Sequence, residues 1–541
     1  MLKKKTNKTV IKSLALGGGS NGGGPCAVDV KDGEIVRIRP LHYDWRYSKE
    51  EFNPWKFERN GKTFGPPMKS LPSPFSLAYK KRVYSPNRIK YPLKRVDWDP
   101  NGERHPENRG KSKFKRISWD EAAEITASEI KRVQGKYGLC AILAQVDGHG
   151  ENKTVHASHG CPTLLLDKMG DFTLQIRNPD SWEGWYWGAK HVWGDGWVGM
   201  MRPANNIIKD ISENCDMVLF WGGDPETTPW GFTGQFASRL CYFWSEVGIK
   251  QIYICPDLNY GAAIHADKWI PILPNTDVAL QLAIAYVWIT EGTYDKEYVA
   301  THTVGFDKFK DYVLGKEDGV PKSPEWASSK CAVPEWIIKA LAREFAARTT
   351  SIAHYFGGGM IRGVYSHEPA RLEVILLGMQ GLGRQGVHQC QTTYTGMPRS
   401  DAGIREMLTG IGHPAFREWS AMTNTKQLIP KTLIHKAILN PPVTSWGSTA
   451  SMSPVEDQFT KYTYPIPEEE GGSEIHMIWC DSPCRTTCWN GGNETIEAMR
   501  NPKIECIVVQ HPWLENDCLF ADIILPINTT LEVEDIVTNV R

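Results

Sequence analysis

The sequence lacks the charge and the apolar runs that would place it with nucleic-acid-binding or membrane proteins. Lys plus Arg and Asp plus Glu number 62 each among the 541 residues. This balance offers no positive surplus for a polyanion or an anionic membrane. The longest largely apolar run, Ala279–Ile289, is far shorter than the ~20 residues that cross a bilayer. The sequence therefore predicts no nucleic-acid partner and no membrane span.

Two common nucleotide-binding signatures are also missing. No G-x-G-x-x-G motif opens a predicted helix, and no G-x-x-x-x-G-K-[ST] motif occurs. The first would place a dinucleotide on a helix N-terminus, and the second would cradle the phosphates of a nucleoside triphosphate. An ordinary dinucleotide site and a P-loop site are both disfavoured.

Cysteine is present but not in pairs that suggest a disulfide framework. The thirteen cysteines are odd in number and scattered, which favours a reducing compartment. Cys480, Cys484 and Cys488 follow a CxxxCxxxC spacing that matches none of the common iron–sulfur patterns. Metal ligation and ordinary burial both remain open for them. The N-terminus is basic, but Lys12 interrupts a very short apolar stretch, so we expect no signal peptide and a cytoplasmic location.

Periodicity predicts an α/β protein. Cys26–Pro40 alternates around Asp32-Gly33 and reads as a β-hairpin. Ile117–Gly138 reads as a helix with Ser118 at its N-cap. Apolar strands that alternate with helices indicate parallel sheets, and two are expected. The expected strands lie in Cys140–Val146, Met217–Glu226, Gln251–Asn259, Trp269–Ile289, Ser351–Gly359, Glu474–Cys484 and Ile504–Pro512.

Four segments are predicted along the chain. They are a β-rich N-terminal domain at 1–110, the first part of an α/β domain at 111–205, an inserted α/β domain at 206–440 and the second part of the first α/β domain at 441–541.

Glycine, proline and acidic residues follow several of the predicted strands. Ligands of parallel sheets bind at the carboxyl ends of strands, where glycine admits phosphate and helix N-termini attract anions. The acids can accept hydrogen bonds from a ribose or a guanine edge. Together these turns predict one or two large nucleotide-like ligands. The candidate binding residues are Trp221, Gly222, Gly223, Asp224, Pro225, Glu226, Thr227, Pro256, Asp257, Asn259, Pro274, Thr276, Asp277, Gly357, Gly358, Gly359 and Met360.

The stretch Asn178–Trp187 is unusually rich in tryptophan and has a serine, Ser181, in its middle. We expect it to be a loop. Its aromatic side chains could simply pack on a core, or they could wall off a pocket in which the serine acts. The composition alone does not separate these interpretations.

Several motifs resemble those of the molybdopterin oxidoreductases of the DMSO reductase superfamily. They are Trp221–Thr228 (WGGDPETT), Cys255–Leu280, Gly378–His388 and Phe520–Pro526 (FADIILP), in the order of that family. The resemblance implies a multi-domain fold with two parallel-sheet α/β domains. The family continues into a C-terminal β-barrel, which we expect this chain to lack.

Further motifs are similar to the large subunits of pyrogallol–phloroglucinol transhydroxylases, among them Gly61–Pro67, Tyr91–Arg95 and Tyr294–Ala300. That resemblance implies molybdenum, or tungsten, held by two molybdopterin guanine dinucleotides. It also implies that Ser181 is a metal ligand, which suits a high-valent metal because an alkoxide is a hard ligand. Asp180 and His149 would then exchange protons with phenolic hydroxyls.

The implied reaction is hydroxyl transfer between polyhydroxylated aromatics, with an aromatic substrate and cosubstrate. Departures at Ala157, Ser158 and Asn528 fall on the substrate side of the family's site. A resorcinol-type aromatic hydroxylase and a reductive catechol dehydroxylase, each with an external electron carrier, therefore remain open. No CxxCxxxC run lies near the N-terminus, so we expect no iron–sulfur cluster in this chain and a small iron–sulfur subunit as partner. A cofactor-free α/β binding subunit is the alternative from another class.

Overall fold

The computed structural model describes residues 7–14, 24–52, 55–145, 161–176, 182–193, 204–227, 234–354, 360, 363, 365–392, 425–446, 461–481, 483–489 and 491–534. The chain forms two compact units. Unit 1 comprises Met1–Arg39, Phe75–Asn178 and Ser400–Asn539, and unit 2 comprises Pro40–Pro74, Pro179–Arg399 and Val540–Arg541. This division is coarser than the four segments predicted above, which stay a prediction.

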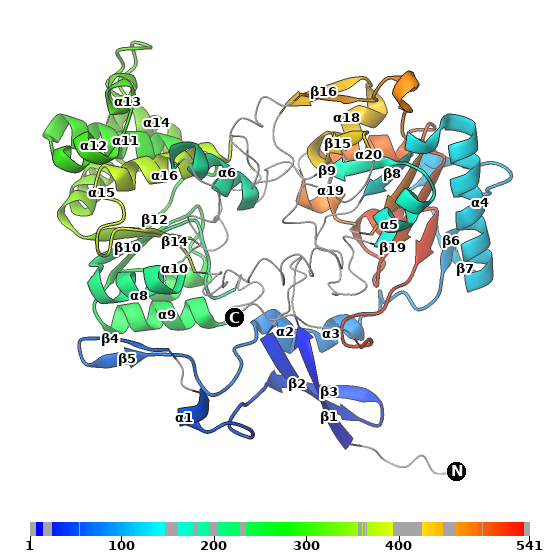
Figure 1. Cartoon of the computed structure of the whole chain (residues 1–541), viewed down its shortest axis with the longest axis horizontal. Coiled ribbons are helices and arrows are strands. Elements are labelled where there is room, and N and C mark those ends of the chain that lie inside the picture. Colours follow the sequence, from blue (N-terminus) through cyan, green and yellow to red (C-terminus); the bar gives the residue numbers. More distant parts are fainter. Residues whose placement is uncertain are drawn as a thin grey trace. The chain divides into compact units, whose positions relative to one another are not determined.

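Unit 2 is built on a five-stranded parallel sheet in the order β12-β11-β10-β13-β14 (Figure 1). Its strands are β10 (Met217–Trp221), β11 (Lys250–Ile254), β12 (Lys268–Ile270), β13 (Thr350–His354) and β14 (Gln389–Gln391). Its longer helices are α6 (Trp182–Trp193), α8 (Ala204–Asn214), α9 (Phe236–Glu246), α11 (Asp277–Glu291), α15 (Glu335–Ala347) and α16 (Glu368–Gly378). Shorter helices are α1 (Lys49–Phe52), α10 (Tyr260–His265), α12 (Lys296–His302), α13 (Phe306–Val313) and α14 (Pro324–Cys331).

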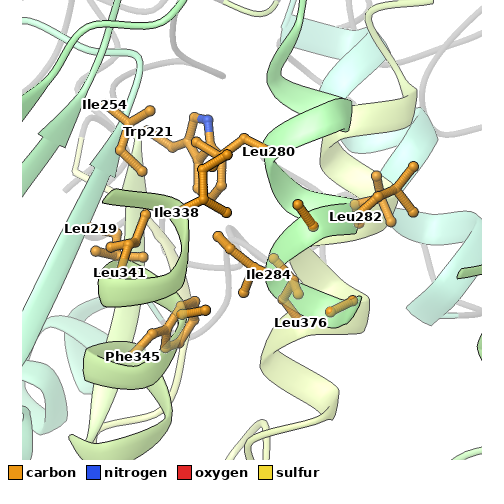
Figure 2. Close-up of a cluster of buried hydrophobic side chains, with 14 of the residues drawn as sticks. Leu219, Trp221, Ile254, Leu280, Leu282, Ile284, Ile338, Leu341, Phe345 and Leu376 are labelled. Atoms are coloured by element: carbon orange, nitrogen blue, oxygen red, sulfur yellow. The ribbon is translucent and has the colours of Figure 1, made fainter. Parts of the chain in front are cut away.

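Alternate side chains of β10 enter different hydrophobic cores on the two faces of this sheet. Leu219 and Trp221 pack with α11, α15 and α16, as Figure 2 shows. Phe220 packs on the other face with α8 and α9. Because both faces are covered, every residue of β10 is buried, as is usual for parallel sheets.

The hairpin β4 (Phe57–Arg59) and β5 (Lys62–Phe64) joins this second core although it lies far away in the sequence. Phe57 and Phe64 stack with ring centroids 5.1 Å apart. Both rings contact Phe243 of α9, Phe57 edge-on at 5.5 Å and Phe64 tilted at 5.3 Å. The segment Pro40–Pro74 therefore belongs to unit 2 because of aromatic burial.

Unit 1 holds an eight-stranded sheet in the order β15-β9-β8-β18-β19-β20-β6-β7, parallel except where β20, β6 and β7 pair. Its strands are β6 (Leu93–Arg95), β7 (Phe114–Arg116), β8 (Ile142–Gln145), β9 (Thr173–Ile176), β15 (Leu428–Pro430), β18 (Met477–Cys480), β19 (Cys506–Gln510) and β20 (Ile523–Leu525). Its helices include α2 (Pro74–Ala78), α3 (Lys80–Val83), α4 (Trp119–Tyr137), α5 (Cys161–Lys168), α18 (Ile434–Leu439), α19 (Arg485–Cys488) and α20 (Gly492–Arg500). A hairpin of β16 (Val443–Trp446) and β17 (Lys461–Tyr464) completes it.

A smaller sheet in unit 1 comprises β1 (Asn7–Leu14), β2 (Gly24–Lys31) and β3 (Glu34–Pro40). The predicted hairpin is confirmed: Asp32 and Gly33 between β2 and β3 have φ of 52° and 87°, the left-handed geometry of a tight hairpin turn. The predicted cap of α4 is also confirmed, because the Ser118 side chain accepts a hydrogen bond from the Glu121 amide at 3.0 Å.

Two α/β sheets are thus present, as predicted; the unit 2 sheet is wholly parallel, and the unit 1 sheet is parallel except at its β20-β6-β7 end. One expectation is wrong: the tryptophan-rich stretch is not a loop from Trp182 onwards, because residues 182–193 form α6. Trp185 and Ala189 are both fully buried and lie four positions apart, which is helical spacing. Within the described ranges, no helix is long and apolar enough to cross a membrane.

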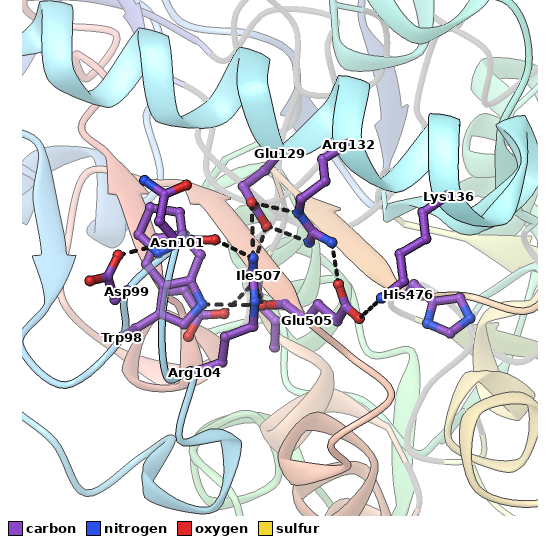
Figure 3. Close-up of polar contacts among 12 residues, drawn as sticks. Trp98, Asp99, Asn101, Arg104, Glu129, Arg132, Lys136, His476, Glu505 and Ile507 are labelled. Atoms are coloured by element: carbon purple, nitrogen blue, oxygen red, sulfur yellow. Dashed lines mark hydrogen bonds and ion pairs between the residues drawn. The ribbon is translucent and has the colours of Figure 1, made fainter.

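A charged network fixes α4 to the end of the loop before β19 (Figure 3). Glu129 pairs with Arg104 at 2.7 Å and with Arg132 at 2.8 Å, and Arg132 also binds Glu505. Burial raises the pKa of Glu505, but hydrogen bonds from Tyr137 and Arg132 outweigh burial and lower that pKa to about 2.

We predict that Glu505→Gln lowers the free energy of unfolding by about 1.5–3 kcal/mol at pH 7, the usual contribution of a hydrogen bond to a charged group. Glu505 has a folded pKa of about 2, below its ordinary value of 4.5, so its contribution is complete above pH 4.5. It is lost as the pH falls from 4.5 toward 2. Urea unfolding of both proteins from pH 7 to pH 3 should show the difference shrinking below pH 4.5. The exposed Glu470→Gln is the control, and a difference that grows on acidification would refute the assignment.

Candidate functional site

The carboxyl ends of the unit 2 strands lie at one edge of the sheet, and buried polar contacts hold the turns there. Trp221 ends β10, and its indole Nε1 donates to Asp277 Oδ1 at 2.9 Å. Asp277 is the first residue of the fifteen-residue helix α11. Burial raises the pKa of Asp277, although the hydrogen bond from Trp221 opposes this. The end of β10 is therefore fixed against a helix N-terminus, which carries partial positive charge.

The turn after β10 is organised by Asp224. Its Oδ1 accepts hydrogen bonds from the amides of Glu226 at 2.9 Å, Thr227 at 3.2 Å and Gly261 at 3.0 Å. Its Oδ2 accepts from the Thr227 hydroxyl. Gly222 has φ of 67°, which a side chain would disfavour. The carboxylate of Asp224 thus shapes the turn and joins it to the start of α10.

Gly261 allows this close approach. A Cβ atom added there would lie 2.4 Å from Pro225 Cδ and 3.2 Å from Asp224 Oδ1. We predict that Gly261→Ala separates the turn from α10 and costs about 1–3 kcal/mol, the usual range for overpacking. Chemical denaturation measures the loss. Gly378→Ala in α16 is the matched control, because a methyl group added at Gly378 would meet nothing within 4 Å among the described residues. Equal stability of the two variants would contradict the close approach.

A contact absent from the sequence-based prediction supports Glu226. His265 at the end of α10 places Nε2 2.6 Å from Glu226 Oε1, and its side chain is almost fully buried. Tyr242 of α9 contacts the same imidazole edge-on at 4.6 Å. Glu226 is thereby held in one orientation at the edge of the sheet.

Asn259 and Asp257 follow β11 and differ in how they are used. Asn259 Oδ1 caps α10 by accepting from the Ala262 amide at 2.9 Å, and its Nδ2 donates to the Gly223 carbonyl at 3.2 Å. Asp257 is exposed, and no hydrogen bond to its carboxylate occurs within the described part of the chain. Leu258 and Tyr260 beside it are 56 % and 66 % exposed. This edge offers a carboxylate acceptor next to apolar surface.

The remaining predicted binding residues divide between surface and core. Pro274 is exposed, and the Thr276 hydroxyl donates to the Leu273 carbonyl at 2.7 Å. Met360 is only 3 % exposed and packs in the core, so its side chain is committed to packing. His149, Asp180, Ser181 and Gly357–Gly359 lie outside the described residues.

A fully buried polar cluster that the sequence did not reveal lies where β13 meets α16 and α6. Glu373 Oε2 lies 2.7 Å from His354 Nε2 and accepts from Gln389 Nε2 at 2.7 Å and Trp185 Nε1 at 3.2 Å. Glu373, His354 and Trp185 are fully buried. This cluster anchors α6, the helix that begins at the residue after Ser181. The sequence predicted no polar contact for Trp185, because its partner Glu373 is 188 positions away.

The three cysteines spaced CxxxCxxxC do not form a metal centre in the part of the chain that the structure describes. No group of three or more His, Cys, Asp or Glu residues there could hold a metal ion. Cys480 is buried at the end of β18, and burial raises the pKa of its thiol well above the ordinary value.

The sequence pattern of the molybdopterin oxidoreductase family matches residues 88–541, and the chain belongs to that family of enzymes. The resemblance drawn from the motifs is confirmed, and membership implies molybdenum bound to molybdopterin. Residues 24–82 match a second pattern, pyrogallol hydroxytransferase large subunit-like, domain 1.

Individual relatives narrow the comparison. The chain is 36 % identical to the pyrogallol hydroxytransferase large subunit of Pelobacter acidigallici, over 96 % of this chain and 62 % of that protein. It is 27 % identical to trimethylamine-N-oxide reductase of Haemophilus influenzae, over 98 % of this chain and 62 % of that protein. Acetylene hydratase from Pelobacter acetylenicus has a similar fold, with a TM-score of 0.51 at 18 % identity over 89 % of this chain and 62 % of that one. The chain thus spans less than two thirds of the length of these relatives.

Proposed function

We propose that the protein transfers or exchanges hydroxyl groups on polyhydroxylated aromatics, using molybdenum held by two molybdopterin guanine dinucleotides. The similarity to the pyrogallol hydroxytransferase large subunit carries this proposal, because it extends over 96 % of the chain and includes the N-terminal segment. The trimethylamine-N-oxide reductase is less similar, at 27 % identity.

The edge of the unit 2 sheet fits one guanine dinucleotide. The Asp257 carboxylate can accept hydrogen bonds from the amino and imino groups of guanine. Among the described residues, none donates a hydrogen bond to this exposed carboxylate. Gly222 has a positive φ, and neither glycine of the Gly222–Gly223 turn has a side chain that would keep a phosphate away from the strand end. Asp224 and Asn259 support these positions through the hydrogen bonds described above.

Ser181, Asp180 and His149 are the proposed residues at the metal. When bound, the metal supplies oxygen-transfer chemistry at an aromatic carbon. The Ser181 oxygen is a hard ligand of the kind that a high-valent metal prefers. Asp180 and His149 are proposed to hold and release the protons of phenolic hydroxyls, since both side chains can change protonation state in a dry pocket.

The electron route follows from the same proposal. A transhydroxylation returns its electrons to a second aromatic molecule. It therefore needs no chain of redox centres within this chain to carry electrons to an external partner. We propose that iron–sulfur clusters belong to a separate small subunit and that the enzyme works in the cytoplasm.

The test is the requirement for a cosubstrate. The purified complete enzyme is incubated anaerobically with a trihydroxybenzene, with and without a second polyhydroxylated aromatic and with and without an artificial electron carrier. Turnover that depends on the aromatic cosubstrate alone supports the proposal. Turnover that requires an electron acceptor indicates a resorcinol-type hydroxylase, and turnover that requires a donor indicates a catechol dehydroxylase.

A further inference from the structure

A pocket in unit 2 lies among the end of α6, α12, the start of α13 and the end of α16 (Figure 1). Helices α6 and α12 both pack against α16. The pocket has a volume of about 630 Å³, within the ~300–1,000 Å³ of small-molecule sites. A cavity of ~150 Å³ already holds benzene, so this pocket has room for more than one ring. None of the proposed cofactor-binding residues lines it.

The walls of the pocket are largely aromatic and apolar. Trp193, Tyr298 and Phe306 contribute rings, and the imidazole of His302 stacks on Tyr298 with centroids 4.2 Å apart and planes 4° from parallel. Trp193 is 42 % exposed and Val304 is fully exposed, so apolar side chains face open space at the pocket. Flat apolar walls favour a planar aromatic ligand.

Charge excludes other kinds of ligand. Among the described residues that line the pocket, none is Asp, Glu, Lys or Arg. A charged molecule that entered would lose hydration and gain no counter-charge from the walls. The pocket therefore favours a neutral ligand.

Two imidazoles add hydrogen-bonding preferences. His191 Nδ1 lies 2.6 Å from the Trp187 carbonyl, which can only accept, so Nδ1 is the donor. His302 Nδ1 lies 2.8 Å from Thr301 Oγ1, whose own hydrogen goes to the Glu297 carbonyl at 2.7 Å. The Nδ1 atom of His302 is therefore also a donor. In a neutral imidazole the other nitrogen accepts, so each ring offers Nε2 as an acceptor, and neither Nε2 has a partner in the described ranges.

The hydroxyl groups of the pocket agree with the imidazoles. Thr303 donates to the Val299 carbonyl at 2.7 Å, and Tyr298 donates to the Leu382 carbonyl. Their hydrogens are committed to the backbone, so their oxygens can only accept from a ligand. A pocket whose polar side chains all present acceptors suits a ligand with hydrogen-bond donors.

We propose that this pocket binds a neutral, planar aromatic molecule of more than one ring that carries hydroxyl groups, which is a polycyclic phenol. Its rings pack on the aromatic walls, and its hydroxyls donate to Nε2 of His191 and of His302. The site is separate from the proposed catalytic residues and does not depend on the proposed function.

A ligand series tests this chemistry on the full chain by anaerobic titration calorimetry. Dihydroxynaphthalene is expected to bind saturably. Dimethoxynaphthalene has the same rings without donors, and it should bind at least about 5-fold more weakly, since a net hydrogen bond contributes about 1 kcal/mol. Naphthalene disulfonate, which is anionic, should not compete with dihydroxynaphthalene.

Variants place the binding in this pocket. Gly378 lines it, and a Cβ atom added there would meet nothing within 4 Å among the described residues. Gly378→Phe should therefore fill the pocket and reduce affinity by more than about 10-fold, as expected when most apolar contacts of a ring are lost. Gly135→Phe in α4 is the matched control, because the space around Gly135 is equally open. His302→Phe keeps a ring beside Tyr298 but removes the acceptor, and should weaken binding about 2- to 12-fold.

Thermal unfolding of each variant checks that the fold is kept. If Gly378→Phe does not fold, His302→Phe and the ligand series decide alone. Failure of dihydroxynaphthalene to bind would overturn the proposal, as would equal affinity for dimethoxynaphthalene. Affinity that is unchanged in a folded Gly378→Phe protein would show that the ligand binds elsewhere, and would overturn it as well.

Discussion

Ser181→Ala is expected to reduce turnover by more than about 100-fold while it leaves the midpoint of unfolding nearly unchanged. Removal of residues that only support a metal ligand costs ~10–100-fold, and loss of a ligand itself should exceed that range. Ser181 is the residue before α6, and α6 is anchored independently by Trp185 and Glu373. We therefore expect α6 to stay anchored when the serine hydroxyl is removed.

The measurement combines initial rates, thermal unfolding and metal content on the same preparations. Ser329→Ala is the control, because the Ser329 hydroxyl donates to the Trp326 carbonyl on an exposed helix face. Full turnover of Ser181→Ala would contradict the proposal that Ser181 is a metal ligand. The tryptophan-rich helix would then be explained by packing alone.

Asp522→Ala is expected to lower the stability of unit 1 by about 3–5 kcal/mol, which is the cost of breaking a buried ion pair from one side. Asp522 is fully buried between two fully buried arginines. Arg95 Nε donates to Asp522 Oδ1 at 3.0 Å, and Arg109 Nη2 lies 2.6 Å from Oδ2. The Ile507 amide also donates to Oδ2 at 2.8 Å. The variant removes the carboxylate from Arg109 and from the Ile507 amide, whereas Arg95 keeps Asp97, 2.7 Å from its Nη1.

Hydrogen exchange of the β19 and β20 amides reports this loss within unit 1 directly. Asp120→Ala is the control, since Asp120 is an exposed residue in the first turn of α4 and contributes only about 0.3–1 kcal/mol through the helix dipole. A loss below ~1 kcal/mol for Asp522→Ala would mean that the buried arginines find other acceptors.

Local patterns carried much of the fold. Short apolar runs predict the strands that begin near Cys140, Met217 and Gln251. Ser118 predicts the start of α4 because serine is a favoured N-cap residue. These signals are local because burial on both faces of a parallel sheet makes a whole strand apolar.

Long-range partners could not be predicted from the sequence. Asp522 meets Arg95 across 427 positions, and Glu373 meets His354 and Trp185 only after the chain has folded. Asp224 looked like a ligand-binding acid in its motif, yet its carboxylate is occupied by three backbone amides. The motifs were enough to indicate the family. Only the structure distinguishes the exposed Asp257 from Asp224, whose carboxylate binds backbone amides.

The most direct test of the account is the metal content of the protein, produced anaerobically together with the proposed small subunit. Elemental analysis should give close to one molybdenum or tungsten per chain, as the proposed pair of pterins sharing one metal requires. A folded protein without either metal, from a host that makes the pterin, would contradict the account and favour a cofactor-free binding subunit.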